Sequence, residues 1–343
     1  MAHRMATRPR ITAVIAVNNA EEHVSRAIES LLSQGIRSLQ IVVVDCASTD
    51  RTKSVCERIS EHELSVDVMS CDTVNVLVGR DCGLTAARGH FVTFMDGDGW
   101  FGKQSLPALL DLAEQDDCSM VVSRHSWDTY DKAGNCSSRL STAVEDGADG
   151  HGLAAALDQL IDGNALDSVC GNVYDTELLQ SSFVGFAEAR GDVSVNAAYL
   201  QHVDKVRLAE GAVYHCPEPE SAVLDPQMFD AVRMAHDDLL QLAATRGGDR
   251  GADIVCSANR WFFRKLVSCI QSVCLSSRVV PSSEGKDRVR AMLESPDTRQ
   301  VVESLKTRNR DLGIMYGAIA KRNVAACYVG SWISGVMHNA PHI

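Results

Sequence analysis

The first hundred residues alternate short, almost continuously apolar runs with segments of helical periodicity. The apolar runs cover residues 11–17, 39–44, 66–69 and 91–95. Apolar residues at helical spacing separate these runs over residues 21–34, 48–60 and 81–88. Continuous apolar runs suit parallel strands that are covered on both faces. This rhythm of strand and helix predicts a doubly wound α/β sheet.

The pattern changes along the rest of the chain. We expect a helix over 105–115 with Pro107 in its first turn, a strand over 120–123 and a Gly- and Ser-rich mobile loop over 133–151. Further short helices are expected over 151–161, 176–180 and 193–201, and late strands over 205–214. Helical patterns follow at 228–245, 258–276, 286–293 and 298–306. The chain is therefore predicted to have an α/β domain over 10–225 and a helical C-terminal region over 226–343.

Composition excludes several classes of protein. The 343 residues carry 33 basic and 45 acidic side chains, a net charge of −12, which argues against non-specific nucleic-acid binding. The 12 cysteines contain no CxxC pair, so we expect reduced, buried thiols rather than a zinc site. Neither a signal-peptide core nor a run of 18 apolar residues occurs, which predicts a cytoplasmic protein without a transmembrane helix.

Two carboxylates, Asp96 and Asp98, follow the apolar run that ends at Met95. Residues two apart in an extended segment point the same way, so both can face one pocket. Hard oxygen ligands at the carboxyl end of a strand suit Mg²⁺ or Mn²⁺ bound to a diphosphate. A polar β-turn at the end of the strand would explain the same residues.

Four blocks, at residues 11–21, 41–50, 79–89 and 94–100, bring these observations together. Their order and spacing resemble those of family-two GT-A glycosyltransferases, the inverting nucleotide-sugar enzymes of bacterial surface polysaccharides. The blocks are similar to that family's Pro-Val-Tyr-Asn-x-Glu, IVVDDGSTD, ARNxGLxxAxG and FLDSDDW motifs. The resemblance covers about residues 10–220 and implies the GT-A fold, a Rossmann-like, mostly parallel sheet with flanking helices.

The resemblance also implies roles for individual residues on the donor side. Asp45 would accept a hydrogen bond from the nucleotide base, usually uracil, and Arg80 would pair with the nucleotide. Asp96 would contact the ribose or a metal-bound water, and Asp98 would ligate the Mn²⁺ or Mg²⁺ that bridges the two phosphates. The remaining nucleotide contacts implied by the first block are Val17, Asn19 and Glu21.

On the acceptor side, residues 169–179 are similar to the family's W-x-K-L-Y-x-x-E-L-L segment. Asp192 then matches the aspartate of the family's acidic pair, which is the general base that takes the acceptor proton; Glu188 is the reserve. His215 is a candidate to complete the metal shell, although a lone histidine is more often a structural residue. The acceptor would be a glycan or a lipid-linked sugar.

Departures from the family's motifs leave a second function open. The second aspartate of the base-binding block is Cys46, the third acid of the metal block is Gly99, the acceptor-side tryptophan is Cys170, and the glutamate before the base is Gly191. Residues 217–220, Pro-Glu-Pro-Glu, stand where the family is basic. The alternative is therefore a non-catalytic module that binds a nucleotide sugar or a partner protein. A dehydrogenase is disfavoured because no GxGxxG follows the first strand.

Two C-terminal segments combine apolar residues with cations. Residues 260–265 read Arg-Trp-Phe-Phe-Arg-Lys, and Lys321-Arg322 precedes an apolar tail over 323–337. Such mixtures occur where helices lie on a membrane surface. They predict peripheral contact with the inner face of the plasma membrane, and an ordinary pair of core helices is the alternative.

Overall fold

The computed structural model describes residues 8–130, 136–141, 152–182, 185–189, 191–217, 228–276, 282–307 and 312–338. It divides the chain into two compact units, Met1–Glu218 and Pro219–Ile343. The predicted boundary near residue 225 and the acidic residues 218–220 lie outside the described residues.

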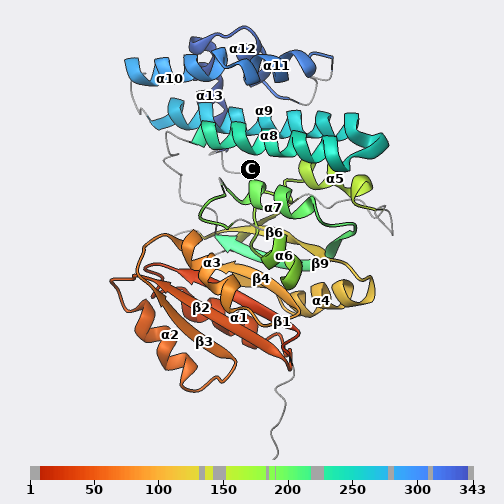
Figure 1. The fold of residues 1–343 in the computed structure, drawn as a ribbon. Coiled ribbons are helices and arrows are strands. Elements are labelled where there is room, and N and C mark those ends of the chain that lie inside the picture. Colours follow the sequence, from red (N-terminus) through yellow and green to blue (C-terminus); the bar gives the residue numbers. More distant parts are fainter. Residues whose placement is uncertain are drawn as a thin grey trace, which may run out of the picture. The chain divides into compact units, whose positions relative to one another are not determined.

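The N-terminal unit begins with four parallel strands, which Figure 1 shows side by side. They are β1 (Ile11–Val17), β2 (Leu39–Cys46), β3 (Val66–Cys71) and β4 (Phe91–Asp96). The helices between them are α1 (Val24–Leu32), α2 (Thr52–Ser60) and α3 (Val76–Ala86). All seven residues of β1 are buried, as its unbroken apolar run requires. The order β3-β2-β1-β4 places β1 between β2 and β4, so their carboxyl ends lie together.

The second half of this unit makes the sheet mixed. The chain continues through β5 (Trp100–Phe101), α4 (Ser105–Gln115), β6 (Met120–Tyr130), β7 (Cys136–Leu140), α5 (Leu153–Asp162), β8 (Val173–Asp175), α6 (Thr176–Ser182), α7 (Asp192–Leu200) and β9 (Val206–Pro217). Strand β8 runs antiparallel to both β4 and β6, and β9 runs parallel to β6. Within the described residues the sheet order is β3-β2-β1-β4-β8-β6-β9-β5, with β7 paired to β6. This arrangement confirms the predicted GT-A type of α/β fold.

Three local expectations are corrected. The second helix begins at Thr52, not near Ser48, and the Asp50 carboxylate accepts the Thr52 N–H at 2.9 Å. The strand expected over 120–123 continues to Tyr130, because β7, β8 and β9 all pair with it. Residues 136–140 of the expected loop form β7, and most of residues 133–151 lie outside the described part of the chain.

The C-terminal unit is helical, as the sequence predicts. Its helices are α8 (Met228–Arg246), η1 (Gly248–Arg250), α9 (Gly251–Ser276), α10 (Ser283–Glu294), α11 (Pro296–Ser304), α12 (Met315–Ala320) and α13 (Val324–His338). The two longest, α8 and α9, lie side by side (Figure 1). Trp261, Phe262 and Phe263 of α9 are at most 3% exposed. The aromatics of residues 260–265 are therefore core residues, and the expectation that this segment contacts a membrane is wrong.

Candidate active site

Two predicted donor-site carboxylates stand at the carboxyl ends of β2 and β4, the two strands on either side of β1. Asp45 of β2 is in register with Val17 of β1, and Asp96 of β4 is in register with Ala16. Because β1 lies between the other two strands, both acids emerge at one edge of the sheet. Asp45 is only 3% exposed, and its Oδ1 has no hydrogen-bond partner among the described residues. A buried carboxylate oxygen without a donor is costly, so this atom calls for a donor from a ligand.

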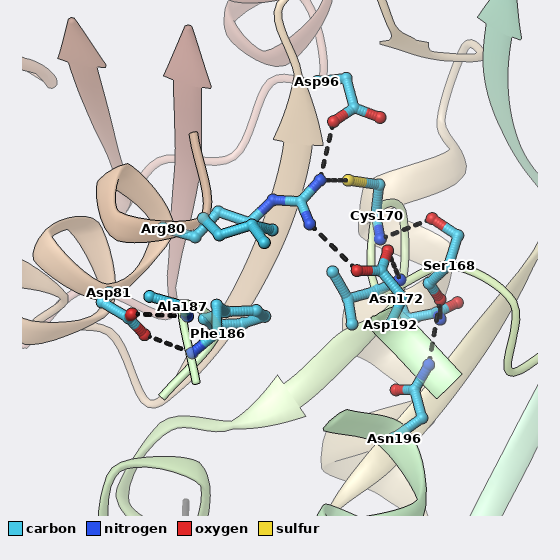
Figure 2. Close-up of polar contacts among 12 residues, drawn as sticks. Arg80, Asp81, Asp96, Ser168, Cys170, Asn172, Phe186, Ala187, Asp192 and Asn196 are labelled. Carbon is cyan, nitrogen blue, oxygen red and sulfur yellow. Dashed lines mark hydrogen bonds and ion pairs between the residues drawn. The ribbon is translucent and has the colours of Figure 1, made fainter. Parts of the chain in front are cut away.

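Arg80 of α3 joins the donor side to the predicted base (Figure 2). Its Nη2 donates to Asp96 Oδ1 at 2.8 Å and lies 3.2 Å from Cys170 Sγ, while Nη1 donates to Asp192 Oδ1 at 3.2 Å. The arginine is buried. Burial lowers the pKa of its guanidinium, but Cys170, Asp192 and Asp96 more than offset this and the net pKa is raised. Arg80 therefore stays a cation between two carboxylates, and its guanidinium nitrogens face protein groups.

Asp192 is the first residue of α7, and two contacts hold its carboxylate in place. Besides the Arg80 contact, Oδ2 accepts the backbone N–H of Val169 at 3.0 Å. Gly191 before it has φ 134°, a conformation that a side chain disfavours, which accounts for the loss of the family's glutamate there. Burial raises the pKa of Asp192, with Arg80 opposing. A carboxylate with a raised pKa is better matched to proton transfer near neutral pH.

Asp98 lies beside Asp96 in the turn between β4 and β5. Burial raises the pKa of Asp98, and the neighbouring charge of Asp96 raises it further. The Asp98 backbone carbonyl accepts Arg26 Nη2 at 2.7 Å, and the same guanidinium lies 3.9 Å from the Trp100 ring centroid. No sequence pattern pointed to Arg26, because a single cation on an amphipathic helix is ordinarily solvated.

Gly99 replaces the family's third acid for a steric reason. A Cβ at this position would lie 2.0 Å from Tyr214 Oη and 2.6 Å from its Cζ. Tyr214 is 1% exposed, and its hydroxyl accepts the Asp96 backbone N–H at 3.0 Å. The tyrosine thus fills the space that a side chain at 99 would need and fixes the backbone of Asp96. The one sequence signal for this role was its position near the end of a late strand.

His215 is held by its own partners. Its Nδ1 lies 2.8 Å from Asp128 Oδ2, and its ring stacks on Trp100 with a centroid distance of 5.0 Å and an interplanar angle of 3°. Ser126 Oγ donates to the other oxygen of Asp128 at 2.7 Å. A carboxylate on one ring nitrogen orients the other, which is how many histidine ligands are supported. The predicted role in a metal shell remains a prediction.

The first-block residues lie around the end of β1. Val17 is 2% exposed. The side-chain carbonyl of Asn19 accepts the Thr49 N–H at 2.8 Å, and Glu21 accepts the Arg51 N–H at 2.8 Å. The side chains of Asn19 and Glu21 therefore hydrogen-bond to the loop after β2. This loop directly follows Asp45 and Cys46, the last two residues of the strand.

A second anchor orders the segment before Asp192. Asp81 stands where the family has asparagine, and its two oxygens accept the N–H groups of Phe186 at 2.6 Å and Ala187 at 3.0 Å (Figure 2). The two carboxylate oxygens accept one bond each, whereas an asparagine would present an NH₂ donor in place of one of them. The reserve base, Glu188, lines an open pocket of about 600 Å³ together with Asp81 and Thr85.

The donor set suits a cation that arrives with its substrate. Among the described residues, no three His, Cys, Asp or Glu side chains are grouped so as to enclose a metal ion. Asp96 keeps 46% of its side chain exposed, and Asp98 follows two residues later. Mg²⁺ is commonly bound by one or two carboxylates together with substrate phosphates and water. Asp96 and Asp98 fit that requirement.

Comparison with known proteins agrees with this geometry. Residues 12–138 match the family model described as glycosyl transferase family 2. The resemblance expected from the four blocks is thereby confirmed. GlyA, a glycosyltransferase of Streptococcus pneumoniae, is 28% identical over 105 residues, which are 31% of this chain and 15% of GlyA.

Two other relatives extend the comparison. WfaP of Escherichia coli, named as a UDP-Glc:α-D-GlcNAc-diphosphoundecaprenol β-1,3-glucosyltransferase, is 25% identical over 91 residues, 26% of this chain and 36% of WfaP. The chain thus spans about a third or less of these two curated relatives. Residues 1–349 of Staphylococcus aureus TarS, solved with UDP-GlcNAc, match with a TM-score of 0.64 at 15% identity, covering 97% of this chain and 93% of that one. This likeness shows a shared fold.

Proposed function

We propose that this protein is an inverting, metal-dependent glycosyltransferase that moves a sugar from a UDP-sugar to a glycan or lipid-linked acceptor. One observation carries the proposal: a single cation, Arg80, contacts both Asp96 on the donor side and Asp192, the candidate base. Asp45 lies at the same sheet edge, one strand away from Asp96 across β1. Residues that are distant in sequence would thus contact the nucleotide base (Asp45), bind the metal (Asp96) and accept the proton (Asp192).

For the donor, Asp45 is the proposed contact to the nucleotide base. Its unpartnered, buried Oδ1 would accept the N3–H of uracil. The solved TarS complex with UDP-GlcNAc, a protein of the same fold, supports a UDP-linked donor. Asp98 and Asp96 would hold Mn²⁺ or Mg²⁺, whose charge stabilises the UDP leaving group. The raised pKa of Asp98 reflects its burial and the charge of Asp96, which a bound cation would relieve.

For the acceptor, Asp192 is the proposed general base. It would take the proton of an acceptor hydroxyl as that oxygen attacks the anomeric carbon on the face opposite UDP. Arg80 and the Val169 N–H fix the orientation of the carboxylate. Arg80 acts as a positioning residue, since its contacts are with Asp96, Asp192 and Cys170.

The decisive experiment follows release of UDP. The protein is incubated with a panel of UDP-sugars and Mn²⁺ or Mg²⁺, with and without undecaprenyl-diphosphate sugars as acceptors. We expect release by the wild-type protein that an Asp98→Ala variant reduces to background. Asp111→Asn, which changes an exposed acid on α4, is the matched control and should keep the activity. Release no faster than that of Asp98→Ala with every donor would exclude catalysis.

A second function is favoured by the same arginine. Because Arg80 engages both Asp96 and Asp192, a protein in which these ion pairs persist would bind a nucleotide sugar without turning it over. Calorimetry separates the two functions. Tight UDP binding that Asp45→Asn weakens, together with no UDP release, would identify a binding module.

Membrane contact is proposed for α13 alone. Val329 and Trp332 are 59% and 66% exposed, and the cations Lys321 and Arg322 immediately before the helix are exposed as well. Exposed apolar residues next to cations suit an anionic bilayer at the cytoplasmic face. WfaP, whose named acceptor carries an undecaprenol lipid, supports a membrane-borne acceptor. Among the described residues, no helix has the length and apolarity needed to cross a bilayer.

Flotation with vesicles tests this contact. Wild-type protein should float with phosphatidylglycerol vesicles, and Trp332→Ser should reduce the floated fraction severalfold without changing the melting temperature. Replacement of the buried Trp261 would instead act on stability. Protein that stays at the bottom of the gradient with anionic vesicles would exclude the contact.

A further inference from the structure

Three of the twelve cysteines gather where β2, β3 and α3 meet. Cys46 and Cys71 are the last residues of their strands and are partners in the parallel register. Cys82 lies in α3. All three belong to one apolar cluster, which also contains Ala16, Val42, Val44, Met69, Val76 and Ala86. The register and the shared cluster place the thiols at the carboxyl edge of the sheet, next to Asp45.

A glycine brings α3 down onto these strand ends. A Cβ on Gly79 would lie 2.4 Å from Cys46 Sγ, so the helix can approach this closely because residue 79 has no side chain. Cys82 follows three positions later and shares the same face of the helix. Cys71 and Cys82 pack against this same cluster, and after burial the neighbouring Cys71 thiol is the next cause that raises the pKa of Cys82.

The three thiols differ in access to solvent. Cys46 is completely buried, whereas Cys71 and Cys82 are both partly exposed. Burial also raises the pKa of Cys46 to about 11, which leaves almost no reactive thiolate near neutral pH. Although Cys46 is the register neighbour of Cys71, Cys82 is therefore the better partner for chemistry at Cys71.

We propose that Cys71 and Cys82 form an oxidisable dithiol, a modification site beside the donor-binding edge. The two thiols lose two hydrogen atoms and form one S–S bond, while hydrogen peroxide is reduced to two molecules of water or a small disulfide to two thiols. Closure would bring the two sulfur atoms, which lie in one packed cluster, to about 2.05 Å. Residues 72–75 are the only connection between the end of β3 at Cys71 and the start of α3 at Val76.

The new bond would act on the proposed donor site through α3. Arg80 lies two residues before Cys82, so tying α3 to the end of β3 would shift the guanidinium that contacts Asp96 and Asp192. This consequence rests on the proposed function. We expect oxidation to lower UDP-sugar turnover by between about tenfold and a hundredfold, the cost of small misplacements in a site, and dithiothreitol to restore it.

Peptide mapping tests the dithiol without reference to activity. The exposed Cys136 is first replaced, as Cys136→Ser, to prevent disulfides between molecules. This protein is treated with equimolar hydrogen peroxide or oxidised glutathione, blocked with N-ethylmaleimide and digested without reduction. We expect a peptide that joins Cys71 to Cys82 and lacks the mass of two hydrogen atoms. Cys71→Ser and Cys82→Ser should each abolish it, and Cys256→Ser, a half-buried cysteine of the helical unit, should not.

Other products would overturn the proposal. If N-ethylmaleimide labels both Cys71 and Cys82 after oxidation, the two thiols do not form a disulfide. A Cys46–Cys71 peptide would show that Cys46, and not Cys82, is the partner of Cys71. Because the wild-type map needs no site variant, misfolding of a variant leaves the result intact. A Cys71–Cys82 peptide in a protein that never releases UDP would refute the proposed enzyme function and leave the dithiol standing.

Discussion

The sheet edge of the N-terminal unit and the core of the helical unit use buried polar groups in opposite ways. At the edge, Arg80 is buried against Asp96 and Asp192, and one oxygen of Asp45 has no protein partner. In the helical unit, His236 Nε2 lies 2.9 Å from Asn259 Oδ1, and Asn259 Nδ2 donates to Ser304 Oγ at 3.0 Å. In the helical unit His236 and Asn259 thus have neutral partners, whereas the edge holds charges whose remaining capacity points to a ligand.

The largest expected effect comes from the candidate base. Asp192→Asn should lower kcat by about 10²–10⁴-fold, because the amide cannot accept the acceptor proton. Asp253→Asn is the matched change in the helical unit, an exposed aspartate in the first turn of α9, and should leave kcat unaltered. Steady-state rates of UDP release by the two purified variants, each compared with wild type, test this prediction. Equal rates of UDP release by Asp192→Asn and wild type would exclude Asp192 as the general base.

A change of the opposite kind is expected in the helical core. Phe262 is fully buried in α9 and packs near His236 with a ring centroid distance of 4.8 Å. Phe262→Ala should lower the free energy of unfolding by about 3–5 kcal/mol through lost burial and the cavity left behind. UDP affinity below the melting temperature should stay within twofold of wild type. A larger loss of affinity with unchanged stability would mean that the helical unit contributes to the donor site.

The substitution Gly99→Asp restores the third acid of the family's metal-binding block and tests whether the site has room for it. Because its Cβ would collide with Tyr214 Oη, we expect overpacking to cost about 1–3 kcal/mol of stability without any gain in Mn²⁺ affinity. Gly317→Asp in α12 is the control, since a Cβ there has no neighbour within 4 Å. Denaturant unfolding and Mn²⁺ titration in the presence of UDP provide the two measurements. Tighter Mn²⁺ binding by Gly99→Asp would show that space is available.

The smallest effect is a shift in pH dependence. A base must be deprotonated, so activity falls when the pH drops through its pKa. Burial raises the pKa of Asp192, and the acidic limb of the kcat/KM profile should therefore begin above the ordinary aspartate value of about 3.9. Profiles between pH 4 and pH 8 at constant ionic strength test this, with far-UV circular dichroism to follow folding. A limb at or below the ordinary value would contradict the raised pKa.

Much of the fold followed from the chain alone. Unbroken apolar runs identified β1, β2 and β4, and helical spacing identified α8, α9, α10 and α11. The short strands β5 and β8 and the extension of β6 could not be predicted, because their pairing depends on strands far away in the sequence. Residues 260–265 were misread for a similar reason, since the same mixture of aromatics and cations suits a membrane surface and a helix core.

By itself, the sequence determined most of the strands and helices, the resemblance to glycosyl transferase family 2 and the identities of the candidate carboxylates, because periodicity and short motifs are local properties. Only the tertiary structure decided how those groups are used. It turned Arg80 from an expected nucleotide contact into a bridge between Asp96 and Asp192, and it explained Gly99 by Tyr214, which is 115 positions further along the chain. It also packed Cys71 and Cys82 against one buried cluster. Contacts of this kind depend on close packing across the sheet edge, which no local pattern encodes.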